Sequence, residues 1–182
     1  AYMLWKYYGR RDMIEKYFPN MVRWMAYMDS RTSHGFATNE ETGWCLGDWG
    51  FPYEEKNYQL LCPNYVNTYF YVRNYNHMAE IADFLGHPKY AKMCREKAEF
   101  SKAAMTAAYM SPMNNCFYND FSGGNSYALD IGIGTKKTLE ETVKKRRKAI
   151  KENIDMLDSI VAEGAISNVN LRLLVQEIQI LD

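Results

Sequence analysis

The sequence predicts an all-α fold built from serial antiparallel α/α-hairpins. Apolar residues recur at the spacing of a buried helix face along most of the 182 residues. In addition, one turn pattern occurs three times: the end of a helix is followed by a glycine, a few polar residues and a new helix. Its three instances are Tyr8-Gly9-Arg10-Arg11-Asp12, Leu85-Gly86-His87-Pro88-Lys89 and Ile133-Gly134-Thr135-Lys136-Lys137. Glycine supplies the left-handed residue that ends a helix, and so short a link makes the next helix return antiparallel.

The first long helix is predicted to begin near Asp12, which with Glu15 fits a capping box. Pro19 is expected to kink or restart this helix. Its buried face is predicted from residues at helical spacing: Ile14, Tyr17, Phe18, Met21, Trp24, Met25 and Met28.

A long irregular stretch, residues 32–64, follows this helix and is the first candidate for function, because loops of this length in compact domains tend to be functional. Within it, Gly43 to Pro52 places the carboxylate of Asp48 beside Trp49 and near Trp44, between glycines that allow a tight backbone. This combination is typical of a carbohydrate pocket, and we expect these three residues to bind substrate. The alternative is a loop packed by its own indoles, in which Asp48 caps a turn.

Further helices are predicted over residues 64–85, 88–109, 126–133, 137–163 and 170–181. His77 is interpreted as a packing residue rather than a catalyst. Serial hairpins bury their apolar faces against neighbours, which suggests a helical bundle, a solenoid or an α/α-toroid. Short links alternating with long loops favour the toroid, with the functional site on the rim that carries the long loops.

Charge and cysteine content exclude several kinds of partner. Twenty-two Lys and Arg balance 22 Asp and Glu, so no overall field attracts nucleic acid or an anionic membrane, and no apolar run reaches the roughly 20 residues of a membrane span. The four cysteines and three histidines lack metal-ligand spacing, and we expect no metal. Free thiols in a reducing compartment are predicted, which favours a cytoplasmic location. The short glycine pairs near residues 123 and 132 follow no strand, so no cofactor is expected.

Several segments, in the same order along residues 1–140, resemble the catalytic domain of bacterial α-L-rhamnosidases, a group of six-hairpin glycosidases with an (α/α)₆ barrel. The most specific is Leu46-Gly47-Asp48-Trp49, and the match is faint after Lys144. The others are Tyr7-Tyr8-Gly9, Glu15 to Trp24, Val66-Asn67-Thr68-Tyr69-Phe70-Tyr71, Glu80-Ile81-Ala82 and Leu85-Gly86.

The resemblance implies an inverting hydrolase that removes terminal α-L-rhamnose from plant glycosides or polysaccharides. Asp48 and Trp49 match the Gly-Asp-Trp motif of the family, whose expected role is to line the sugar subsite. The family's general acid motif would lie upstream of this stretch and its general base glutamate downstream. Neither motif is found in the chain, so no catalytic residue is assigned.

Residues 1–182 are therefore expected to form a single partial domain, the central portion of the (α/α)₆ barrel, within an enzyme. The chain opens without a capping residue, as if within a helix. Apolar hairpin faces left exposed are expected to cause self-association. The alternative function is a non-catalytic helical-repeat scaffold, but a scaffold needs no long loops rich in Trp and Tyr.

Overall fold

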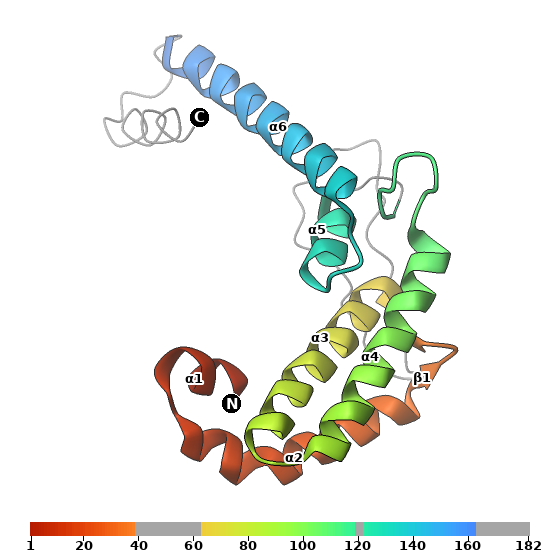
Figure 1. The fold of residues 1–182 in the computed structure, drawn as a ribbon. Coiled ribbons are helices and arrows are strands. Elements are labelled where there is room, and N and C mark those ends of the chain that lie inside the picture. Colours follow the sequence, from red (N-terminus) through yellow and green to blue (C-terminus); the bar gives the residue numbers. More distant parts are fainter. Residues whose placement is uncertain (39–62, 119–121, 163–182) are drawn as a thin grey trace. The chain divides into compact units, whose positions relative to one another are not determined.

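The computed structural model describes residues 1–38, 63–118 and 122–162, and the chain divides into two compact units, Ala1–Thr138 and Leu139–Asp182 (Figure 1). The described residues are almost entirely helical, which confirms the predicted fold class. Their elements, in chain order, are α1 Tyr2–Tyr8, α2 Arg11–Ser30, β1 Thr32–Ser33, β2 Phe36–Ala37, α3 Pro63–Phe84, α4 Pro88–Tyr109, α5 Ser122–Asp130 and α6 Lys136–Ala162. The helix expected over residues 170–181 lies outside the described residues.

The link between α3 and α4 is the hairpin turn that the sequence predicts. Gly86 has a φ of 79°, and the amide of His87 donates to the carbonyl of Ala82 at 2.7 Å while that of Gly86 donates to Asp83 at 3.1 Å. These two bonds form a Schellman motif, which satisfies carbonyls that a helix end leaves free. The two helices then run antiparallel side by side (Figure 1).

In the third predicted turn, the glycine that ends the helix lies two residues earlier than expected. The helix ends at Asp130, and the left-handed glycine is Gly132, with a φ of 79°, rather than Gly134. The amide of Ile133 donates to the carbonyl of Ala128 at 2.9 Å, again as in a Schellman motif. At Gly134 the constraint is steric: a Cβ atom there would lie 2.6 Å from the side chain of Leu129.

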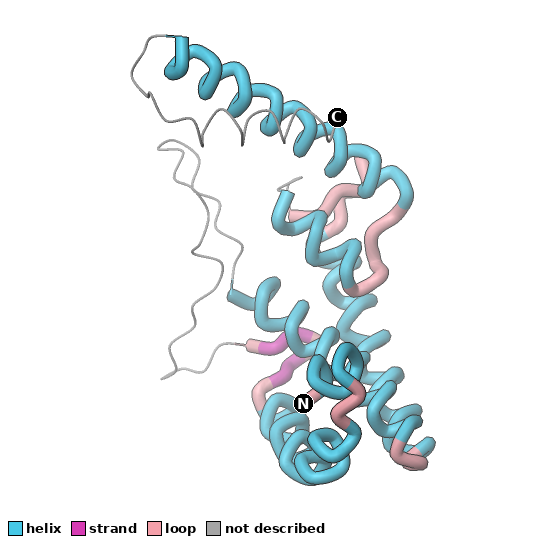
Figure 2. Tube along the Cα trace, turned by 90° about the vertical axis from the view of Figure 1, so that its left-hand side faces the viewer, coloured by secondary structure: helices cyan, strands magenta, loops and turns pink. Residues whose placement is uncertain are grey.

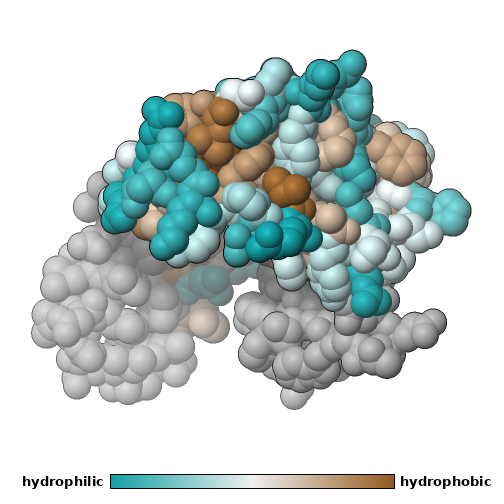
Figure 3. All heavy atoms as spheres, turned by 90° about the horizontal axis from the view of Figure 1, so that it is seen from below, coloured by the Kyte–Doolittle hydropathy of each residue, from teal (hydrophilic) through white to brown (hydrophobic). Residues whose placement is uncertain are grey.

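The helix α2 departs from its predicted details. It runs through Pro19 without restarting. Its N-cap residue is Arg10 rather than Asp12 and makes no side-chain capping bond, while Asp12 lies inside the helix and pairs with Arg10 at 2.8 Å. Of the predicted buried face, Ile14 and Met25 are fully buried, whereas Trp24 is 54% exposed. The remaining predicted residues are part-buried (Phe18, Met21, Met28) or exposed (Tyr17). Figure 3 shows one face of the molecule, on which apolar side chains are exposed between hydrophilic ones.

Within residues 1–138, α3 is the central helix. Its side chains at Tyr71 and Tyr75 point to the C-terminal end of α2, where Asp29 also meets Lys97 of α4. The opposite stripe of α3 faces α1 and α5. Residues of α1 and of the end of α5 line a pocket with this stripe, whereas α4 packs along α3 at the hairpin.

The long segment that follows α2 begins with a small antiparallel β-hairpin, which Figure 2 shows in magenta; an irregular stretch was predicted here. The buried hydroxyl of Thr68 accepts a hydrogen bond from the amide of Ala37 at 3.0 Å and donates to the carbonyl of Asn64 at 2.6 Å. Thr68 therefore attaches the start of the segment to the helix that follows it.

The helix α6 begins with reciprocal hydrogen bonds between Thr135 and Thr138, each side chain meeting the other's backbone amide. This arrangement caps the first turn in the manner of a capping box. Beyond Thr138 the helix belongs to the second unit, and Ile154 is buried there. No helix in the described ranges is long and apolar enough to cross a membrane.

Candidate functional site

The three residues predicted to bind substrate, Trp44, Asp48 and Trp49, lie outside the described residues. Cys45 and Cys62 lie outside them as well. The other two cysteines, Cys94 and Cys116, are buried free thiols. Burial raises the pKa of Cys94 to about 11, which makes it a poor nucleophile. Residues 1–38, 63–118 and 122–162 contain no group of three potential metal ligands.

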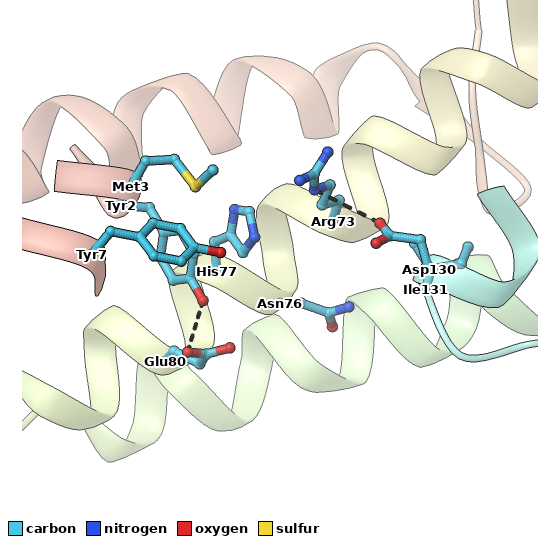
Figure 4. A pocket seen from close by; sticks show the side chains of 9 residues that line it. All are labelled: Tyr2, Met3, Tyr7, Arg73, Asn76, His77, Glu80, Asp130 and Ile131. Carbon is cyan, nitrogen blue, oxygen red and sulfur yellow. Dashed lines mark hydrogen bonds and ion pairs between the residues drawn. The ribbon is translucent and has the colours of Figure 1, made fainter. Parts of the chain in front are cut away.

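A polar pocket of ≈ 290 Å³ lies on the side of α3 that faces α1 and α5, within the first unit (Figure 4). One stripe of α3 forms its floor with Arg73, Asn76, His77 and Glu80, which are spaced so that they share a helix face. The other lining residues come from α1 and from the end of α5: Tyr2, Met3, Tyr7, Asp130 and Ile131. The site thus combines three helices that are far apart in sequence.

At the α1 side of the pocket, Tyr2 and Glu80 fix the arrangement. The ring of Tyr2 stacks on His77 with 3.7 Å between centroids and 9° between planes. Its hydroxyl donates to Oε2 of Glu80 at 2.9 Å, and the Lys6 ammonium donates to the same oxygen at 2.7 Å. The two bonds therefore orient the Glu80 carboxylate and leave Oε1 facing the pocket (Figure 4).

At the α5 side, Asp130 is the central acceptor. The Tyr69 hydroxyl donates to its Oδ2 at 2.7 Å, and the guanidinium of Arg73 lies 3.8 Å from the same oxygen. The Tyr69 ring also stacks on Tyr127 of α5 at 4.2 Å. Burial, together with the hydrogen bond to Asp130, raises the pKa of Tyr69 to about 12, so its hydroxyl remains a donor.

Glu80 is not suited to donate a proton to a leaving oxygen. Burial raises the pKa of Glu80, but the hydrogen bonds from Lys6 and Tyr2 outweigh it and keep this carboxyl below its usual range. A general acid in a glycosidase needs a raised pKa instead. Across the described ranges, the carboxyl groups whose pKa is shifted, Asp12, Asp29 and Glu80, are all shifted downward.

His77 is both a packing residue and a pocket residue. Burial lowers its pKa, and the nearby Arg73 lowers it further, so the imidazole is neutral at pH 7. The sequence interpretation of His77 as a packed side chain is confirmed by the stack on Tyr2, but that interpretation missed its place in a pocket. The signal that could have found it is the run of polar residues at helical spacing from Arg73 to Glu80.

A second polar cluster lies on the opposite side of α3. Asp29 accepts hydrogen bonds from Tyr71 and Tyr75 and pairs with Lys97 at 2.7 Å. A more open cavity of ≈ 420 Å³ adjoins it, bordered by Phe100 and the β-hairpin. Since every polar atom at the centre of this cluster has a partner, we assign it to fold stability.

Comparison with known protein families supplies the decisive observation. Residues 1–167 match the family described as the bacterial alpha-L-rhamnosidase 6 hairpin glycosidase domain.

The chain belongs to this family. The resemblance seen in the sequence is therefore confirmed, over nearly the whole chain. The all-α hairpins of the structure agree with the six-hairpin architecture that the family's description names. Searches of curated proteins and of solved structures gave no match.

Proposed function

We propose that the complete protein hydrolyses terminal α-L-rhamnose from glycosides with inversion of the anomeric centre. We also propose that residues 1–182 are the central portion of its (α/α)₆ barrel. The family match over residues 1–167 carries this proposal, because it extends across the hairpins and the Gly-Asp-Trp segment. The polar pocket between α1, α3 and α5 adds support, since a sugar requires several directed hydrogen-bonding groups.

In this proposal the chain contributes sugar recognition rather than the acid and base. Inverting hydrolysis uses two carboxyl groups about 6.5–9.5 Å apart, one protonating the leaving oxygen and the other activating water. The lowered pKa of Glu80 does not suit the acid role. The acid and the base would come from other parts of the complete protein.

Asp48, Trp49 and Trp44 are proposed to line the rhamnose subsite. An indole can cover the apolar face of a sugar ring, and a carboxylate accepts strong hydrogen bonds from ring hydroxyls. Asp48 and Trp49 would then hold the ring in a fixed orientation relative to the missing carboxyl pair.

The test is hydrolysis of an aryl α-L-rhamnoside by the complete protein, beside the matching aryl β-D-glucoside and aryl α-D-mannoside. We expect aglycone release from the rhamnoside at least tenfold faster than from the other two. A protein that binds rhamnosides but releases no aglycone would instead support the helical scaffold.

A further inference from the structure

We propose that the pocket between α1, α3 and α5 is a binding site for one neutral sugar ring, formed by Tyr7, Asn76, Glu80 and Asp130. None of these residues belongs to the Gly-Asp-Trp segment, so this site goes beyond the rhamnose subsite proposed above. It relies on the glycosidase function only for the choice of sugars among polyhydroxyl ligands.

The first argument is charge. Arg73 and Lys6 supply two positive charges, and Glu80 and Asp130 supply two negative ones, which balance. With His77 neutral at pH 7, the site carries no net charge. Such a pocket gives no advantage to a phosphate or a carboxylate, and an uncharged ligand that both donates and accepts hydrogen bonds fits it.

The second argument is the acceptors that remain free. Both bonds to Glu80 end on Oε2, and the contacts of Asp130 with Tyr69 and Arg73 end on Oδ2. Within the described part of the chain, Oε1 of Glu80 and Oδ1 of Asp130 therefore each retain capacity to accept from a ligand. Hydrogen bonds from hydroxyl groups to ionised carboxylates are among the stronger ones, and two such acceptors in one pocket suit a ring that bears several hydroxyls.

The third argument is that the side-chain amide of Asn76 and the ring of Tyr7 are available to a ligand. Asn76 lies between His77 and Asp130 in Figure 4, and its side-chain amide makes no hydrogen bond within the described part of the chain. Its side chain both donates and accepts. Tyr7 borders the pocket with 71% of its surface exposed, so one flat apolar face is available for the C–H face of a sugar. Tyr2, by contrast, already uses a face on His77.

The size of the pocket agrees with a small ligand. At ≈ 290 Å³ it lies just below the range of about 300–1,000 Å³ for the sites of drug-sized ligands. It therefore suits a single ring rather than a long oligosaccharide.

The experiment is isothermal titration of the complete protein with L-rhamnose, D-glucose and D-glucuronate. The variants are Asn76→Ala and Tyr7→Ala, with Asn74→Ala and Tyr8→Ala as matched controls, since Asn74 and Tyr8 are neighbours that do not line the pocket. Each titration is repeated in a Trp49→Ala background, so that binding at the rhamnose subsite is reduced. Circular dichroism and Tm verify that each variant is folded.

We expect a neutral sugar to bind with an affinity at least tenfold weaker in Asn76→Ala and Tyr7→Ala than in either control. Glucuronate should bind no better than glucose. The proposal is overturned if no neutral sugar binds saturably, if the pocket variants bind like the controls, or if glucuronate binds tenfold tighter than glucose. Because calorimetry needs no turnover, a failure of the rhamnosidase proposal would show separately, as absent aglycone release with sugar binding intact.

Discussion

The hydroxyl of Tyr75 donates a 2.6 Å hydrogen bond to Oδ1 of Asp29, joining the middle of α3 to the last turn of α2. Tyr71 donates to the same oxygen at 2.7 Å, and Lys97 of α4 donates to Oδ2. One carboxylate thus connects three helices. Its position at the end of α2 also places it just before the β-hairpin with which the long segment begins.

Replacement of Asp29 by Ala should destabilise the protein by about 2 kcal/mol, because two tyrosine hydroxyls and an ammonium lose a shared acceptor in a part-buried site. The measurement is the free energy of unfolding in urea. Asp12→Ala is the control, since Asp12 forms a solvent-exposed pair with Arg10 whose loss should change stability far less. Equal effects of the two substitutions would show that the cluster does not join the helices.

Acid should lower the free energy of unfolding by protonating the Asp29 carboxylate. Burial raises the pKa of Asp29, but the hydrogen bonds from Lys97, Tyr75 and Tyr71 outweigh it and hold the pKa below the ordinary 3.8. Because the pKa of Asp29 is lower in the folded protein, the unfolded chain binds a proton at a higher pH than the folded protein does. The stabilisation that the Asp29 carboxylate contributes is therefore present above pH 3.8 and is lost as the pH falls through the pKa of the folded protein.

The check is the free energy of unfolding as a function of pH for the wild type and Asp29→Asn. We expect the wild type to lose more stability than the variant below pH 3.8. Parallel curves would contradict the assignment, because Glu80, whose pKa is also lowered, is present in both proteins.

Gly132 and Gly134 should respond to substitution in opposite ways. At Gly132 the left-handed backbone is the constraint, and nothing lies within 4 Å of an added Cβ atom. Ala should therefore cost about 1–2 kcal/mol and Asn less, because Asn tolerates this conformation. At Gly134 the constraint is the contact with Leu129, so the larger Asn should cost more than Ala. Thermal unfolding of the four variants measures the order, and the same order at both positions would refute the displaced cap.

The helical hairpins could be predicted because their signals are local. Helical periodicity and the Gly86 turn depend on residues within a few positions of one another, and both were confirmed. Gly134 was taken for the cap because local sequence does not reveal that Leu129 packs against its backbone. Trp24 has the right spacing for the buried face, yet 54% of its surface is exposed. Periodicity defines a stripe, whereas burial depends on what packs there.

The pocket could not be predicted from the sequence for a different reason. Tyr2 and His77 stack although they lie far apart in the chain, and Asp130 comes from a third helix. Such a site forms only when α1, α3 and the end of α5 come together in the fold. The sequence could reveal the polar stripe of α3 but not its partners.

The motif residues Asp48 and Trp49 remain predictions, since they lie outside the described residues.

For the complete protein, Trp49→Ala and Asp48→Asn should lower kcat/KM for an aryl α-L-rhamnoside while leaving the fold intact. Loss of an aromatic stacking surface costs on the order of 1 kcal/mol, which corresponds to at least a fivefold decrease. The packing control is Met25→Ala rather than a change at the exposed Trp24, because Met25 is only 2% exposed and its truncation should cost about 2–5 kcal/mol of stability. Should Trp49→Ala unfold the protein as Met25→Ala does and leave activity in the folded fraction unchanged, Trp49 would be a loop anchor.

The most direct test of the proposed function is ¹H NMR of the sugar released by the complete protein from an aryl α-L-rhamnoside, recorded before the anomers equilibrate. An inverting rhamnosidase releases β-L-rhamnose first, with the α anomer appearing later by mutarotation. We predict that order. Release of α-L-rhamnose first, or no release of rhamnose, would contradict the account.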